Sequence, residues 1–178
     1  MREEFAKTEF ETCKMMMNTN CMSHIAITKG FLPLLVKQDK SRIVNIISIA
    51  GMIGTGFRTM YSAAKFGTAG FFKSLRAEVK QYNVGITNIY PEFVKTNISK
   101  NAVLGEGQSF GKTDLNIQSG IDVDVAVDTI LRATYLGYDE VIVGRILYHI
   151  LPSLCFLSST INNLIGSIAY SRSKEAIR

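Results

Sequence analysis

The sequence predicts an α/β fold in which helices flank a parallel β-sheet. Two runs rich in β-branched residues, RIVNIIS at 42–48 and VGITNIYP at 84–91, have the composition of buried strands. A long segment of small and apolar residues lies between them, from about Met60 to Tyr82, and suits a helix. Parallel strands need such a crossover, so the order strand, helix, strand indicates a parallel sheet with right-handed connections.

The flanking elements follow from apolar periodicity and from helix start and stop signals. In chain order, the sequence predicts a long helix from about Lys7 to Val36, strands at Ile43–Ile47 and Val84–Tyr90, a helix capped by Asp122 or Asp124 that ends near Tyr135, and a short last strand from Glu140 to Gly144. With 178 residues, of which 47% are hydrophobic and 20% charged, the chain is ordinary for one globular core.

The composition argues against several classes of protein. The net charge of +5 is spread along the chain without a basic run that interleaves with aromatic residues, so nucleic-acid binding has no support. Three cysteines, Cys13, Cys21 and Cys155, and two distant histidines lack metal-ligand spacing, so we expect neither a metal site nor a disulfide framework. This pattern suits an intracellular, reducing compartment or a cytosol-facing membrane surface.

The candidate catalytic residues lie in SIAGMIGTGFRTMYSAAK, at 48–65. Tyr61 and Lys65 are four residues apart in the expected helix, so both side chains project from one face. A nearby cation favours the phenolate and lowers the tyrosine pKa from its usual value of about 10, which lets the hydroxyl exchange protons with a substrate. Ser48 ends the first strand, and the glycines after it let the chain turn back toward the helix. A Tyr-x-x-x-Lys pair alone also arises by chance on helix surfaces, so this context decides its meaning.

Together these residues resemble the active-site segment of the classical short-chain dehydrogenase/reductases. The shared features are a strand that ends in Ser, a Gly-rich turn, a Tyr thirteen residues after the Ser, and a Lys four residues later. The register of the family pattern assigns a fourth catalytic position to Asn20. The resemblance implies that Tyr61 is the general acid/base, that Lys65 lowers its pKa and binds the nicotinamide ribose, that Ser48 polarises the substrate carbonyl, and that Asn20 holds a proton-relay water.

The resemblance also implies a cofactor, NADP or NAD. After the second strand the family has Pro-Gly, a short loop and Thr, and here the chain reads PEFVKT at 91–96. The expected cofactor-binding residues are therefore Tyr61, Lys65, Pro91, Val94 and Thr96, with Thr96 at the carboxamide. Glu92 replaces the family glycine and puts a carboxylate where the family's backbone passes close to the nicotinamide.

The resemblance extends over nearly the whole chain but only over the second half of the family. The 178 residues contain no Gly-x-x-x-Gly-x-Gly turn and no Asn-Asn-Ala-Gly segment, which would bind the adenosine and pyrophosphate. We expect a partial, Rossmann-like doubly wound fold without its N-terminal strands, in which residues 1–145 form the catalytic half and residues 146–178 an apolar tail.

The implied reaction is hydride transfer between the cofactor and a carbonyl or alcohol substrate, and the chain alone is expected to be inactive. The alternative is a truncated, non-catalytic relative that acts as a binding or assembly partner.

Two later segments allow more than one interpretation. Ile98–Gly120 is rich in Gly, Ser, Asn and Gln, and is either a substrate lid, as in the resembled family, or a plain surface loop. Ile146–Ser171 holds no Asp, Glu, Lys or Arg, and it fits a membrane-spanning helix, a hairpin at a membrane surface or under a partner, or a buried helix. The loop NAVLGEGQSFG and the tail ILPSLCFL are most similar to membrane-associated members of the family. We therefore expect a lipid-like substrate, a surface such as the endoplasmic reticulum or another organelle membrane, and a homo-oligomer.

Overall fold

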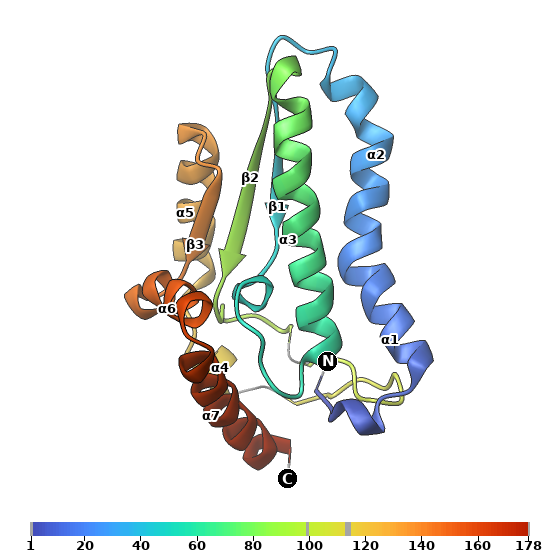
Figure 1. Ribbon diagram of the computed structural model, residues 1–178, viewed down its shortest axis with the longest axis vertical. Coiled ribbons are helices and arrows are strands. Elements are labelled where there is room, and N and C mark those ends of the chain that lie inside the picture. Colours follow the sequence, from blue (N-terminus) through green and yellow to red (C-terminus); the bar gives the residue numbers. More distant parts are fainter. Residues whose placement is uncertain (1, 99, 113–114, 178) are drawn as a thin grey trace.

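The sheet at the centre of the molecule is parallel, as the sequence predicts. The computed structural model describes residues 2–98, 100–112 and 115–177. Its strands are β1 (Ser41–Ile46), β2 (Val84–Pro91) and β3 (Glu140–Val143). They pair in the order β1-β2-β3, and both pairings are parallel, so the three carboxyl ends lie at the same edge of the sheet (Figure 1). The α/β fold is thereby confirmed.

Helices cover both faces of this sheet (Figure 1). Helices α2 (Ser23–Leu35) and α3 (Thr59–Val79) lie on one face, and α5 (Val123–Leu136) lies on the other. Successive residues of a strand point to opposite faces. In β1, Ile43 accordingly packs in the apolar cluster of α3, whereas Val44 packs in the cluster of α5. Burial from both sides explains why the strand sequences are nearly continuous apolar runs.

The N-terminal helical segment differs from the single helix predicted between about Lys7 and Val36. The structure divides it into α1 (Phe10–Met17), a π-helical turn at Asn18–Met22, and α2. In the π turn the N–H of Ser23 bonds to the carbonyl of the residue five positions earlier instead of four. The predicted catalytic Asn20 lies in the middle of this turn, and π turns inside helices are frequent at functional sites.

The segment predicted as a lid or surface loop, Ile98–Gly120, packs against the beginning of the chain. Its described part includes the short helix α4 (Leu115–Gln118). The backbone N–H of Arg2 donates to the carbonyl of Val103 (2.9 Å), and its guanidinium lies 5.1 Å from the ring centroid of Phe110. The N-terminal residues therefore help to hold this long connection in place.

The C-terminal helices α6 (Ile146–Leu157) and α7 (Ser159–Ile177) continue from the carboxyl end of β3 (Figure 1). No residue of α6 is buried, and Phe156 is 91% exposed. Tyr170 of α7 stacks on the ring of Phe57, with ring centroids 4.8 Å apart, and this contact attaches α7 to the turn before α3. Among the described residues, none of the helices combines the length and the hydropathy that crossing a membrane requires.

Candidate active site

Tyr61 and Lys65 lie in the first two turns of α3, on one face of the helix. The Nζ atom of Lys65 is 5.7 Å from the centroid of the Tyr61 ring. Lys65 is only 7% exposed, and this burial lowers its pKa below the usual value of a lysine, while nearby Cys21 acts in the opposite direction. Tyr61 is half-buried. The structure thus brings the side chains of Tyr61 and Lys65 near each other, as their spacing predicts.

Ser48 lies two residues after β1, where the chain turns toward α3. Its Oγ accepts a hydrogen bond from the Ala50 N–H (3.1 Å) and caps a short 3-10 turn, Ile49–Gly51. Gly51 packs on α3 without room for a side chain, because a Cβ there would lie 2.9 Å from the Lys65 carbonyl oxygen. This contact holds the Ser48 turn against the part of α3 that carries Lys65.

Asn20 is attached to α3 through its backbone. The hydroxyl of Thr68, which is fully buried, lies 2.8 Å from the Asn20 carbonyl and 2.8 Å from the Ala64 carbonyl, and shares its proton between them. Thr68 is one helical turn after Lys65, so the Asn20 carbonyl lies beside the face that carries Lys65. The Asn20 side chain donates to the Met16 carbonyl of its own helix (3.2 Å). Thr68 was not among the predicted residues; its signal is a hydroxyl three positions after the lysine, among small and apolar residues.

Glu92, which stands at the family's glycine position, is paired within the fold. Its side chain is fully buried, and Oε1 accepts hydrogen bonds from the backbone N–H and from Nε of Arg145, both at 3.0 Å. The hydrogen bond to Glu92 raises the pKa of Arg145. A Cβ at Gly144 would lie 2.7 Å from Cγ of Glu92, so a glycine is needed at the end of β3 to admit this side chain. The carboxylate therefore binds the start of α6.

The side chain of Val94 packs in the apolar cluster of β2, β3 and α5. Only the backbone of Val94 is therefore left to contact a cofactor. It forms a parallel bridge with Ile121, in which the carbonyl of Phe93 accepts at 2.9 Å and the N–H of Lys95 donates at 3.0 Å. In such a bridge the two neighbours of Val94 make both bonds, so the N–H and C=O of Val94 itself point to the other side of the chain. A donor and an acceptor therefore lie next to each other after the carboxyl end of β2.

The other two predicted cofactor contacts flank Val94. Pro91 is the last residue of β2 and is half-buried. Thr96 is exposed, and its Oγ1 accepts a hydrogen bond from the Ile98 N–H at 3.3 Å. The structure thus places the predicted residues after β1 and β2 at the same edge of the sheet as Tyr61 and Lys65.

Arg58 brings a second cation toward Tyr61. Its guanidinium carbon lies 5.4 Å from the ring centroid of Phe93. Burial lowers the pKa of Arg58, and the proximity of Tyr61 and Tyr148 acts in the opposite direction. Burial also raises the pKa of Tyr148. Arg58 was not among the predicted residues, although an arginine three positions before a candidate catalytic tyrosine is a visible signal.

Comparison with known proteins bears on the family of the chain. The family profile of the short chain dehydrogenases matches residues 1–107. Dehydrogenase/reductase SDR family member 7B of Xenopus laevis is 35% identical over 169 residues, which cover 94% of this chain and 51% of that protein. Dehydrogenase/reductase SDR family protein 7-like of Drosophila melanogaster is 32% identical over 163 residues, covering 88% and 50%. The chain spans about half the length of these curated relatives.

Solved structures resemble the fold. A short-chain dehydrogenase from Streptomyces avermitilis matches with a TM-score of 0.72 at 18% identity, over 97% of this chain and 68% of that one. A short chain dehydrogenase from Burkholderia cenocepacia in complex with NADP matches with a TM-score of 0.66 at 24% identity, over 83% and 56%. The fold and the family match over more than half of the chain lead to one conclusion: this chain belongs to the short-chain dehydrogenase/reductase family.

Proposed function

We propose that this chain carries the catalytic residues of an NADP- or NAD-dependent carbonyl reductase or alcohol dehydrogenase. The observation that supports this most is Lys65, a residue only 7% exposed whose Nζ lies 5.7 Å from the Tyr61 ring centroid, on the part of α3 to which the Ser48 turn is also attached. Lys65 is therefore the cation placed to stabilise the negative charge that remains on Tyr61 after proton transfer.

The three side chains then have separate tasks in a reduction. Tyr61 donates its phenolic proton to the substrate oxygen, and Lys65 stabilises the phenolate that results. Ser48 donates a hydrogen bond to the same oxygen and polarises the carbonyl. Its Oγ acts as an acceptor toward the Ala50 N–H, which leaves the hydroxyl proton for the substrate. Asn20, in the π turn beside α3, is assigned to the water that returns a proton to Tyr61.

The residues present fit the nicotinamide end of the cofactor. The carboxamide carries both donors and an acceptor, and the outward N–H and C=O of Val94 complement it. Lys65 supplies donors for the ribose. Arg145 neutralises Glu92, so the carboxylate at the family's glycine position does not repel the cofactor phosphates. When bound, the nicotinamide ring supplies or accepts the hydride.

The proposed substrate is apolar and lipid-like, and the proposed location is a membrane surface. α6 starts at the carboxyl end of β3, the edge of the sheet at which the catalytic residues lie. Its large apolar side chains are exposed: Ile146, Leu147, Ile150, Leu154, Phe156 and Leu157. An exposed apolar surface of this kind favours the interfacial region of a bilayer, where an apolar carbonyl compound would also partition.

The test separates binding from chemistry. The chain is fused to the C-terminal end of the nucleotide-binding half of another family member. NADPH affinity and carbonyl reduction are then measured for the wild type, Tyr61→Phe and Lys65→Ala. We expect Tyr61→Phe to retain NADPH affinity within a few-fold and to lose turnover by about 10²-fold or more, because only the transferable proton is removed. Lys65→Ala should weaken both. NADPH binding without reduction of any aldehyde or ketone by the wild type would favour the non-catalytic alternative.

A further inference from the structure

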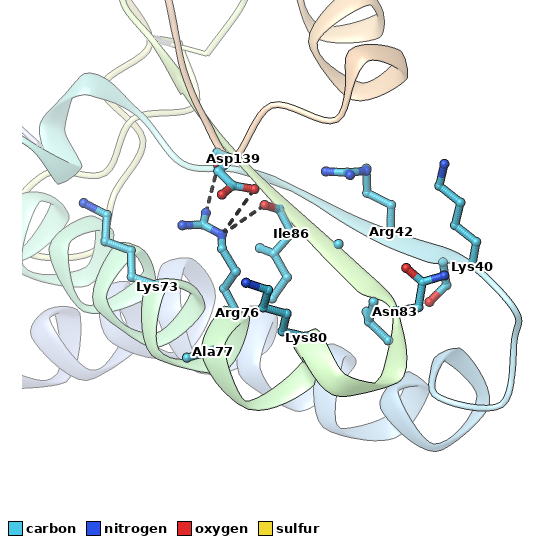
Figure 2. A pocket seen from close by; sticks show the side chains of 12 residues that line it. Lys40, Arg42, Lys73, Arg76, Ala77, Lys80, Asn83, Ile86 and Asp139 are labelled. Carbon is cyan, nitrogen blue, oxygen red and sulfur yellow. Dashed lines mark hydrogen bonds and ion pairs between the residues drawn. The ribbon is translucent and has the colours of Figure 1, made fainter.

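We propose a second ligand site, for a small polyanion such as pyrophosphate or a phosphate monoester, at the amino ends of the strands. A cavity of about 400 Å³ lies between the starts of β1 and β2 and the last turns of α3 (Figure 2). Its charged lining residues are five cations and one carboxylate: Lys40, Arg42, Lys73, Arg76, Lys80 and Asp139. This concentration of positive charge around one cavity indicates an anionic ligand.

Two of the five cations are neutralised within the fold. Arg76 places Nη2 at 2.6 Å from Oε1 of Glu140 and Nε at 3.8 Å from Oδ1 of Asp139. It also donates to the carbonyls of Ile86 and Asp139, as the dashed lines in Figure 2 show. Lys73 lies 3.8 Å from Glu140. These contacts hold one wall of the cavity in place, and they pair the carboxylates of Asp139 and Glu140 with Arg76 and Lys73.

Arg42 is held in position without a carboxylate. Its Nη1 donates to the Thr87 hydroxyl at 2.8 Å. A Cβ at Gly85 would lie 2.7 Å from its guanidinium carbon, and a Cβ at Gly137 would lie 3.0 Å from Nη2. The guanidinium therefore lies close to the backbone at Gly85 and at Gly137. A positioned guanidinium loses less conformational entropy when it binds an anion.

Three cations remain for a ligand. Among the residues that the structure describes, no carboxylate oxygen lies within ion-pair distance of Lys40, Arg42 or Lys80. Ser41 and Asn83 add polar groups to the lining. Phosphate oxygens accept hydrogen bonds from such donors and carry the opposite charge, so a ligand with two or three negative charges matches the cavity.

This cavity is separate from the catalytic site. Gly85 and Pro91 lie near opposite ends of β2, six residues apart, and a strand rises roughly 3.3 Å per residue, so the two sites are about 20 Å apart. A ligand in the cavity therefore does not compete with a cofactor bound near Tyr61.

The test is binding of pyrophosphate to the purified chain by calorimetry at low salt. A second series, with saturating NADPH, uses the chain fused behind the nucleotide-binding half of a family member. The main variant is Lys40→Gln/Lys80→Gln, in which both changed residues are exposed; the matched control is Lys29→Gln, on α2 and outside the cavity. We expect the double variant to weaken binding at least tenfold, because it removes two of the three cations that remain for the ligand. Lys29→Gln and NADPH should leave the affinity unchanged, and Arg42→Gln should reproduce the loss.

A second arm identifies the source of the phosphate. Phosphatidic acid vesicles are compared with phosphatidylcholine vesicles for the wild type and the double variant. Pyrophosphate binding supports a soluble phosphate ligand, and capture by phosphatidic acid alone, lost in the double variant, supports a lipid headgroup. Equal pyrophosphate affinity in the wild type and the double variant, or no binding to either probe, would overturn the proposal. Thermal unfolding of each variant confirms that a lost affinity is not a lost fold.

Discussion

The ion pair between Glu92 and Arg145 leads to an asymmetric prediction about stability. Glu92 is the fully buried partner, whereas the Arg145 side chain is 54% exposed. Arg145→Ala therefore leaves a buried carboxylate without its cation, and Glu92→Gln leaves only a guanidinium that water can solvate. We expect Arg145→Ala to be the more destabilising of the two.

The contacts set the magnitude. Arg145→Ala removes the Nε contact at 3.0 Å, but the backbone N–H of residue 145 still donates to Oε1 of Glu92. A hydrogen bond to a charged group contributes about 1.5–3 kcal/mol, and because water screens the exposed guanidinium we expect a loss at the lower end, about 1.5 kcal/mol. Glu92→Gln keeps the shape and the acceptor for that N–H, so we expect a loss of about 0.5 kcal/mol. The double variant should lose less than the sum of the two.

Urea unfolding at neutral pH and low salt measures these differences. The matched control is Arg132→Ala, an exposed arginine of α5, which should change the free energy of unfolding by less than about 0.5 kcal/mol. The reasoning fails if Arg145→Ala is indistinguishable from Arg132→Ala, or if Glu92→Gln is the more destabilising change.

Four further predictions concern the catalytic face, the tail and the chain alone. Because the folded state binds a proton at Lys65 less tightly than the unfolded state, stability should rise with pH from the lowered pKa of Lys65 toward its ordinary value of 10.5, and this rise in the urea midpoint should be absent from Lys65→Met. Thr68→Val should cost about 1–3 kcal/mol in the same assay, because the Asn20 carbonyl loses its buried donor, whereas a cost below about 0.5 kcal/mol would mean that this bond does not hold the π turn. Phe156→Glu/Leu157→Glu should reduce flotation with anionic vesicles, and equal flotation would argue against the membrane surface. Expressed as these 178 residues, the chain should show no nucleotide-dependent activity and no rise in melting temperature with NADP, and either one would show that this half suffices for cofactor binding.

Local patterns were enough to predict the strands and the central helix. The apolar runs at 42–48 and 84–91 are buried on both faces of a parallel sheet, so their composition alone identifies them. The π turn at Asn18–Met22 could not be predicted, because the bond that accompanies it joins Asn20 to Thr68, 48 residues away. Helical periodicity reflects only the sequence of the segment itself, so it carries no information about a contact with another helix.

The candidate site divides in the same way. Tyr61 and Lys65 meet because they are one helical turn apart, which spacing alone predicts. The partner of Glu92 is 53 residues further along the chain, so the sequence suggested a carboxylate near the cofactor where the structure has an ion pair with Arg145. The outward backbone of Val94 likewise depends on a bridge to another segment.

The most direct test of the catalytic assignment is transfer of an isotope label. The chain, fused behind a family nucleotide-binding half, is incubated with NADPH deuterated at the nicotinamide C4 position and a panel of apolar aldehydes and ketones, and the alcohols are analysed by mass spectrometry. We expect deuterium in the product of the wild type and none above background with Tyr61→Phe, while both proteins bind NADPH. Deuterated alcohol formed by Tyr61→Phe at the wild-type rate would contradict the assignment of Tyr61 as the proton donor.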